Sequence, residues 1–250
     1  KKERFTNMKY FAFLNDIIDN FRVSKMIEIV KIEQDLETNE LITVAYEATR
    51  SLIIVANYKD RPDIDMPQVQ GFSQLDFIKQ IISLEAQGEK SSVKFKDSDG
   101  YAVETNFKID NTNIKNKNVA KSLLPETPRK LSGFAPDLEV ELDEKTIADV
   151  LRKLSLSIFN ASVFITKSSK GNLSLKLTND VDVVDIDLPF AVEDGVLDEP
   201  FKIDLERLQA ILKVGSAGVK LAISEKQNLA RIVKDNDTAE YQYFLIKKAS

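Results

Sequence analysis

Apolar residues recur at spacings of three and four in four segments of the chain, as along the buried face of an α-helix. Helices are predicted from Thr6 to about Arg22 and from about Ser73, as N-cap, to Leu84; two more open at Asp143 and Asp204, both good N-cap types. The predicted core residues of the four helices are Phe11, Leu14, Ile17, Ile18 and Phe21; Leu75, Ile78, Ile81 and Ile82; Ile147, Val150, Leu151, Leu154 and Ile158; and Leu205, Leu208, Ile211 and Leu212.

Between the helices the hydrophobic pattern changes to period two, which predicts strands with one buried face. Strands are predicted at 93–96, 173–178, 181–183, 186–188 and 241–245, and residues 41–58 are long enough for two strands that turn near 48–51. Hairpin turns are predicted at 97–100, 168–171 and 234–237. The predicted fold is therefore α+β, with two short helices packed on antiparallel sheets in each half of the chain.

The order of helices and strands occurs twice, which indicates an internal duplication. Leu75 to Leu84 matches Leu205 to Val214 at an offset of 130, and Val93 to Phe95 matches Val219 to Leu221 at an offset of 126. We expect an N-terminal domain over 1–113, an extended connector over 114–136 and a C-terminal domain over 137–250. The alternative is that any two amphipathic helix–hairpin units look alike.

Composition narrows the possible chemistry. The chain has 250 residues with no His and no Cys, which excludes a His-based catalytic triad, a thiolate nucleophile and His or Cys metal ligands. We therefore expect a protein that is not an enzyme and needs no cofactor or metal. No apolar run is long enough to span a membrane and no signal peptide opens the chain, so we expect a cytoplasmic location and no membrane partner.

Net charge argues against a conventional DNA-binding domain. The chain carries a formal charge of −5, whereas such domains usually carry a basic excess. Residues 1–130 hold equal numbers of basic and acidic residues, so the whole excess of acid lies in residues 131–250. Contact with nucleic acid must therefore be local, or rest on geometry rather than on overall charge.

Two similar halves joined by an extended connector in an acidic chain of this length resemble a DNA sliding clamp, as found in the trimeric clamps of phages and of archaeal–eukaryotic replication. The resemblance is carried by Asp143–Leu154 with the hairpin at 169–172, and by Phe201–Leu208 continuing through Val219–Leu221 to Tyr241–Leu245. It covers residues 65–250 well and 1–60 more loosely, because the strand that should precede the first helix is absent or lies upstream of Lys1.

The resemblance implies a homotrimeric ring that encircles double-stranded DNA without reading its sequence and tethers a DNA polymerase as a processivity factor. It implies a clamp loader as a further partner, and the host cytoplasm as the location if the protein is viral. Cations on the helices and hairpin tips would face the DNA: Lys9, Lys79, Lys145, Arg152, Lys153, Lys167, Lys170, Arg207 and Lys213. The alternative is a solvated face with weak ion pairs, since acidic residues share these helix faces: Asp16, Asp19, Asp76, Asp149 and Glu206.

Family clamps also capture a short partner peptide in an apolar groove near the connector and the last strand. Here Leu123, Leu124, Tyr241 and Tyr243 could contribute to such a groove. The alternative is that the two tyrosines are cross-strand core residues.

Two rival functions remain open. A structural or virion protein built on duplicated domains would have no DNA-tethering activity. A carboxylate-based hydrolase would need two acids about 5–9.5 Å apart in a cleft, and the sequence selects no such pair. The acidic strand around Asp182, Asp185 and Asp187 does not predict a metal site, because these three residues cannot share one strand face.

Overall fold

The computed structural model describes residues 9–23, 27–35, 37–38, 40–127, 134–155, 162–168, 170–178, 183–191, 197–215 and 218–248. Thr6, Ile158, Ser169 and the predicted strand residues 181–182 lie outside this part of the chain. The structure divides into two compact units, each described separately below: Lys1–Thr127 with Asn236–Tyr241, and Pro128–Asp235 with Gln242–Ser250. These units are defined by spatial contacts, whereas the domains 1–113 and 137–250 come from sequence repetition and stay predictions.

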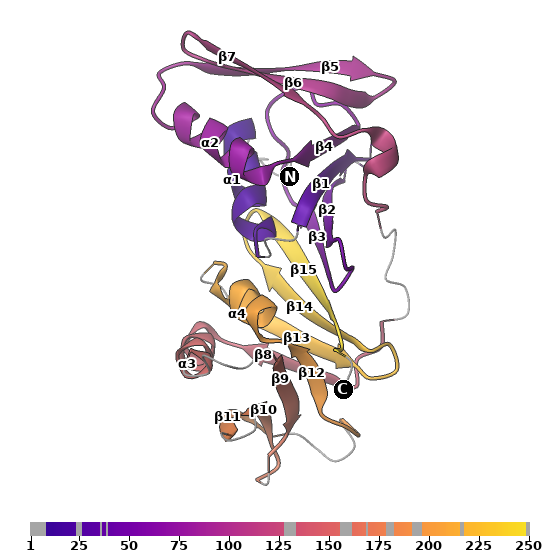
Figure 1. Ribbon diagram of the computed structural model, residues 1–250, viewed down its shortest axis with the longest axis vertical. Helices are drawn as coiled ribbons and strands as arrows, with labels where there is room; N and C mark the ends of the chain where they lie inside the picture. Colours follow the sequence, from indigo (N-terminus) through magenta and orange to yellow (C-terminus); the bar gives the residue numbers. More distant parts are fainter. Residues whose placement is uncertain are drawn as a thin grey trace, which may run out of the picture. The chain divides into compact units, whose positions relative to one another are not determined.

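The first unit packs two helices on a mostly antiparallel sheet (Figure 1). The helices are α1 (Tyr10–Phe21) and α2 (Leu75–Glu85), and a short 3-10 helix, η1 (Lys121–Leu123), follows the last strand. Its strands are β1 (Ile27–Gln34), β2 (Leu41–Glu47), β3 (Leu52–Tyr58), β4 (Val69–Ser73), β5 (Ser91–Ser98), β6 (Tyr101–Ile109) and β7 (Thr112–Lys117). They lie in the order β5-β6-β4-β1-β2-β3 with β7 on β6, and only the short β4–β6 pairing is parallel.

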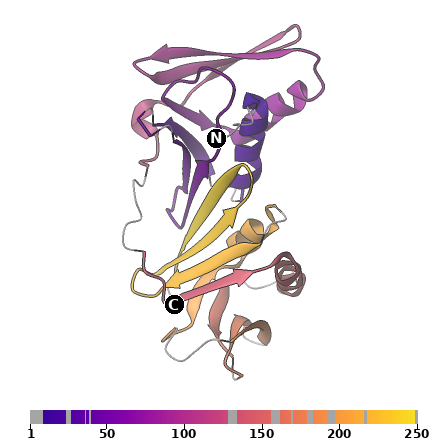
Figure 2. The ribbon, with the colours of Figure 1, turned by 180° about the vertical axis from the view of Figure 1, so that it is seen from behind.

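The second unit also carries two helices, α3 (Glu144–Leu154) and α4 (Leu205–Lys213), which Figure 2 shows from behind. Its strands are β8 (Leu138–Leu142), β9 (Ser162–Lys167), β10 (Asn172–Thr178), β11 (Val183–Ala191), β12 (Phe201–Asp204), β13 (Val219–Ser224) and β14 (Leu229–Asp235). They form antiparallel ladders in the orders β11-β10-β9-β12 and β14-β13-β8. The last strand, β15 (Ala239–Ile246), is divided between the units after Tyr241.

The helix predictions are largely confirmed. Asp143 and Asp204 cap α3 and α4, accepting hydrogen bonds from the backbone N–H of Thr146 and Arg207. The described residues of the predicted core faces are buried, except that Leu151 is only half-buried. The N-cap prediction for Ser73 is wrong.

The second helix is entered differently because β4 runs directly into it. Ser73 is the last residue of β4, and the N-cap is Gln74, which has a left-handed backbone (φ 56°) and makes no capping hydrogen bond with its side chain. A strand that continues to the helix needs one residue that turns the chain sharply, and this conformation provides the turn.

Among the described helices, none is long and apolar enough to cross a membrane.

A buried polar network ties α1 to β3 and β15 within the first unit. The hydroxyls of Tyr241 and Tyr58 both donate to the Asp16 carboxylate, the second at 3.0 Å, and the Asn20 amide donates to it at 3.2 Å. Burial raises the pKa of Asp16 above its ordinary value, while the hydrogen bonds from the two tyrosines act in the opposite direction. The hydrogen bonds of the network therefore offset the free-energy cost of burying the charged Asp16 carboxylate.

We expect Tyr241→Phe to destabilise the protein by about 1.5–3 kcal/mol, because it removes a hydrogen bond to a charged, half-buried group. Tyr101→Phe is the matched control: the Tyr101 hydroxyl is buried and has no hydrogen-bond partner among the described residues, so its loss should leave stability unchanged or slightly raised. Urea denaturation of the three proteins measures this. Equal stability losses in the two variants would contradict the role of the network.

In the second unit, a buried lysine from a strand caps the C-terminal end of helix α4. Lys234 on β14 is 5% exposed, and its ammonium donates to the carbonyl of Ile211 at 2.5 Å and to that of Val214. These carbonyls lie at the C-terminal end of the helix, where the backbone lacks intrahelical donors and favours a cation. Burial lowers the pKa of Lys234 to about 8.

This lowered pKa predicts a pH dependence of stability. Between about pH 8 and the ordinary lysine pKa of 10.5, the unfolded chain binds more protons at this site than the folded chain does. The free energy of unfolding should therefore rise with pH in this window, by up to about 3 kcal/mol from this group. Urea denaturation of the wild type and of Lys234→Met from pH 7 to 10 isolates the contribution of Lys234 to the free energy of unfolding. A difference between the two proteins that does not change with pH would contradict the assignment.

Candidate nucleic-acid interface

The helix cations predicted to face DNA lie on the polar faces of their helices. Lys9 precedes α1, Lys79 lies on α2 and Lys145 on α3, and all three side chains are exposed, as is Lys213 at the end of α4. Within the described residues these four lysines make no ion pair. They are available to an external anion.

Three other predicted cations are held by acids of their own helix. Arg152 and Lys153 both contact Asp149, at 2.7 and 2.6 Å, and these hydrogen bonds lower the pKa of that carboxyl. Arg207 pairs with the N-cap residue Asp204 at 2.9 Å, with only 17% of its side chain exposed. For these three, the alternative of local ion pairs describes the observed geometry, and their role toward DNA stays a prediction.

The charge of the helices differs between the two units. Helix α1 contains two acidic residues and no basic one, and α2 contains two acidic residues and one basic. Helix α3 has two acidic and three basic residues, and α4 has one acidic and two basic. A polyanion near the helices would therefore be attracted mainly by the second unit.

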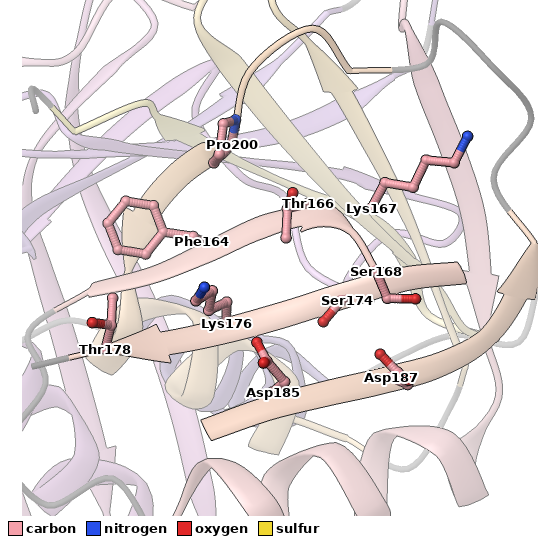
Figure 3. A pocket seen from close by; sticks show the side chains of 10 residues that line it. All are labelled: Phe164, Thr166, Lys167, Ser168, Ser174, Lys176, Thr178, Asp185, Asp187 and Pro200. Atoms are coloured by element: carbon pink, nitrogen blue, oxygen red, sulfur yellow. The ribbon is translucent and has the colours of Figure 1, made fainter. Parts of the chain in front are cut away.

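One of the two predicted hairpin cations, Lys167, lines a shallow groove on the four-stranded sheet of the second unit (Figure 3). Lys167 ends β9, and Lys170 lies in the following turn, 3.9 Å from the Asp187 carboxylate. The groove has a volume of about 530 Å³ and carries two lysines, two aspartates and four hydroxyl side chains. It is lined by Phe164, Thr166, Lys167, Ser168, Ser174, Lys176, Thr178, Asp185, Asp187 and Pro200.

The groove brings two carboxylates to one face. Asp185 and Asp187 alternate with the buried Ile186 on β11, so they are about 6.6–6.8 Å apart along the strand. This spacing meets one requirement of the hydrolase alternative, but both aspartates are exposed, whereas a general acid needs a buried environment that keeps it protonated. Lys176 lies directly opposite Asp185 on β10, so the groove balances its own charge.

Residues 114–117 of the predicted connector belong to strand β7, paired with β6, so the connector begins after Lys117. Its described residues, 118–127, pack against the face of the first unit's sheet that lies opposite the helices. The Leu124 side chain covers Gly71 on β4 so closely that a Cβ at Gly71 would overlap it, and the Val119 N–H donates to the Gly71 carbonyl at 2.9 Å. Further along, the Tyr46 hydroxyl donates to the carbonyl of Glu126. Gly71 and Tyr46 were not predicted, because no local pattern indicates which strand residues a connector will cover.

The four residues predicted for partner binding separate into two groups. Leu123 is 65% exposed on η1 and Leu124 is half-buried beside it, so both lie at the surface of the connector. Tyr241 and Tyr243 are 0% exposed, which places them in the core, as the alternative held. A docking surface on the isolated chain can therefore include the leucines but not the two tyrosine rings.

We expect Leu124→Ala to loosen the connector, because it removes roughly 1 kcal/mol of apolar burial against β4. Tryptic cleavage after the exposed Lys121 should then become about fivefold faster. Leu123→Ala is the control, because this neighbouring side chain is mostly in solvent and its loss should leave the rate unchanged. Mass spectrometry of the early fragments measures both. Similar rates in the two variants would show that Leu124 does not fasten the connector.

No protein-family model and no curated protein matches the sequence. Among solved structures, the chain is similar to A. fulgidus PCNA, in a structure that has the C-terminal region of FEN-1 bound to it. The TM-score is 0.67, over 96% of this chain and 96% of that chain, at 14% sequence identity. At this identity the likeness shows the fold: the chain has the PCNA-like α+β clamp fold that its sequence predicts.

Proposed function

We propose that this protein is a DNA sliding clamp, a non-enzymatic processivity factor that encircles duplex DNA and tethers a DNA polymerase. The observation that carries the proposal is the likeness to PCNA over almost the full length of both chains, with two helices on one sheet face in each unit. A clamp loader and a cytoplasmic location, in the host if the protein is viral, belong to the same proposal.

A ring needs two complementary edges on each copy, and the sheets supply candidates. Strand β7 pairs only with β6 and is an edge of the first unit's sheet, and β11 is an edge of the four-stranded sheet in the second unit. Strand β5 is the other edge beside β6, but its counterpart in the duplication is β13, whose second neighbour is β8, so the edge that corresponds to β5 is already occupied in the second unit. An exposed strand edge pairs readily with another strand, and a head-to-tail pairing of two different edges closes into a ring. We propose a homotrimer in which β7 of one copy pairs with β11 of the next.

The side chains on these edges agree with that pairing. Ile114 on β7 lies opposite Phe107, which faces the helices of the first unit, and Ile186 and Leu188 on β11 lie in the core of the second. A continuous sheet with the helices on one side would bring these apolar residues to one face.

The opposite faces carry complementary charges. Lys115 and Lys117 on β7 are exposed, and so are Asp185 and Asp187 on β11. Opposite charges on neighbouring strands stabilise the pairing and like charges oppose it, so the pattern favours β7 with β11 over β7 with β7.

The sparse helix cations suit a clamp that slides. Contacts to phosphates position a protein without reading sequence, and few of them are needed when the ring itself prevents dissociation. The similar PCNA has a segment of FEN-1 bound to it, and we propose that DNA-processing proteins bind this chain through a short segment near Leu123 and Leu124.

We expect a mass near three times 28.2 kDa by light scattering at high protein concentration, decreasing toward one chain on dilution. Reversing the charge of β7 with Lys115→Glu and Lys117→Glu should shift this equilibrium toward the single chain. Adding Asp185→Lys and Asp187→Lys should restore the ring, because the pairs are then re-formed with opposite sign.

Lys226→Glu, at an exposed turn between β13 and β14, is the control for surface charge and should leave the mass unchanged. Ring formation should be accompanied by stimulation of a cognate polymerase on a primed circular template. A strictly monomeric chain would contradict the ring, and a ring without stimulation would favour the structural or virion alternative.

A further inference from the structure

The face of the first unit's sheet that lies opposite the helices carries a cluster of lysines on three neighbouring strands. The strand register places them in adjacent rows: Lys94 and Lys115 flank Asn106, Lys96 and Lys117 flank Glu104, and Lys108 lies between Ser92 and Asn113. We call this set the outer-face lysines: Lys94, Lys96, Lys108, Lys115 and Lys117.

The alternation of these strands fixes which way the cluster faces. Phe95 on β5 contacts the Tyr10 ring of α1 at 5.5 Å, and Phe107 on β6 contacts the Phe11 ring at 5.9 Å. Neighbouring residues in a strand point to opposite faces, so the lysines beside these phenylalanines point away from the helices. The cluster is therefore separate from the helix cations considered above.

The cluster has a net positive charge. All five side chains are exposed, and none makes an ion pair with a described residue. In the strand register Glu104 is opposite two of the lysines and the other three are opposite neutral residues, so five cations share one acid among the described residues of this face. Such a local excess of positive charge, in a chain of net charge −5, attracts anions.

The other side chains of this face indicate what kind of anion fits. They are Ser92, Asn106 and Asn113, which with lysine are the types that contact phosphate and sugar. Among the described residues of β5–β7, no exposed apolar or aromatic side chain lies on this face, so it lacks the anchor that a peptide interface is usually built on and the stacking platform that single-stranded bases need.

We propose that the outer-face lysines form a second DNA-binding surface, which holds the phosphate backbone of a duplex on the face opposite the helices. The strand repeat of about 6.6–6.8 Å and a separation of about 4.8 Å between strands place the ammonium groups close enough to contact several neighbouring phosphates. Binding is independent of sequence and sensitive to salt. It requires no ring, so this inference does not depend on the proposed function.

The surface remains available if the ring forms. A neighbouring copy at the β7 edge would approach Lys115 and Lys117, whereas Lys94 and Lys96 lie on β5 and Lys108 lies on β6, away from that edge. The test therefore uses Lys94 and Lys108, so that a loss of DNA binding does not arise from a broken ring.

The experiment measures binding of the full chain to a linear duplex of about 30 base pairs by fluorescence anisotropy, between about 50 and 200 mM salt. Lys94→Gln with Lys108→Gln should weaken binding at every salt concentration and reduce the slope of log affinity against log salt by about 2. The matched variant is Lys121→Gln with Lys226→Gln, which removes two exposed lysines that lie outside both the outer-face lysines and the helix cations, and it should leave binding and slope as in the wild type.

Two results would overturn the inference: wild-type binding by the outer-face variant, or an equal loss in both variants, which would mean that only total charge matters. Displacement of the duplex by poly-glutamate at the same charge concentration would also overturn it, in favour of an acidic protein partner. The mass in solution and the polymerase assay test the clamp separately, since a monomer with this DNA affinity, or a ring without it, is a distinct outcome.

Discussion

The structure depends on strands that alternate between a face packed beneath helices and an opposite face, which is covered by the connector at β4 and exposed on β5–β7. Alternate residues of β5 and β6, such as Phe95 and Phe107, pack against α1, and Ile186 and Leu188 are buried in the same alternation on β11. Because the strand period is two, this packing also decides which residues face solvent on the other side. The lysines of β5–β7 and the aspartates of β11 are on the exposed face because their neighbours are in the core.

The polar groups inside the core are placed where chain segments distant in sequence must be joined. Asp16 is bonded by Tyr58 and by Tyr241, which is 225 residues away, and Lys234 ends a helix that lies 20 residues earlier in the chain. An apolar contact would tolerate a shift in register. A buried carboxylate or ammonium, in contrast, loses the hydrogen bonds that offset its desolvation when its partners move. These two sites therefore specify the arrangement within each unit as well as stabilising it.

Much of the fold follows from local sequence patterns. The helix stripes, the N-caps Asp143 and Asp204, and the strand alternation at 173–178 each report a local preference that the tertiary structure reinforces. Ser73 failed because a favourable N-cap residue was already the last residue of a strand. The duplication could suggest similar units, but it gave no information on which residues the connector would cover.

Candidate site residues were harder to predict, for physical reasons. A sequence shows that Arg152 and Arg207 lie on polar helix faces, but not that Asp149 and Asp204 hold them. The period-two pattern at Tyr241 and Tyr243 predicted a strand, but their burial depends on segments far away in the chain. The outer-face lysines come from three strands whose register is needed before five separate residues can be recognised as one surface.

The charge distribution in the two units is inverted, and this inversion connects the two proposed surfaces. In the first unit the helices carry four acids and one base, while the outer-face lysines cover the opposite side of the sheet. In the second unit the helices carry an excess of base, and the sheet charges are paired locally, as Lys220 with Glu141 and Lys170 with Asp187. In the proposed clamp, enclosure would replace electrostatic affinity, so cations would not be needed on every helix. The positive charge of the first unit then lies on the other face, where the proposed second surface presents it to an anionic partner.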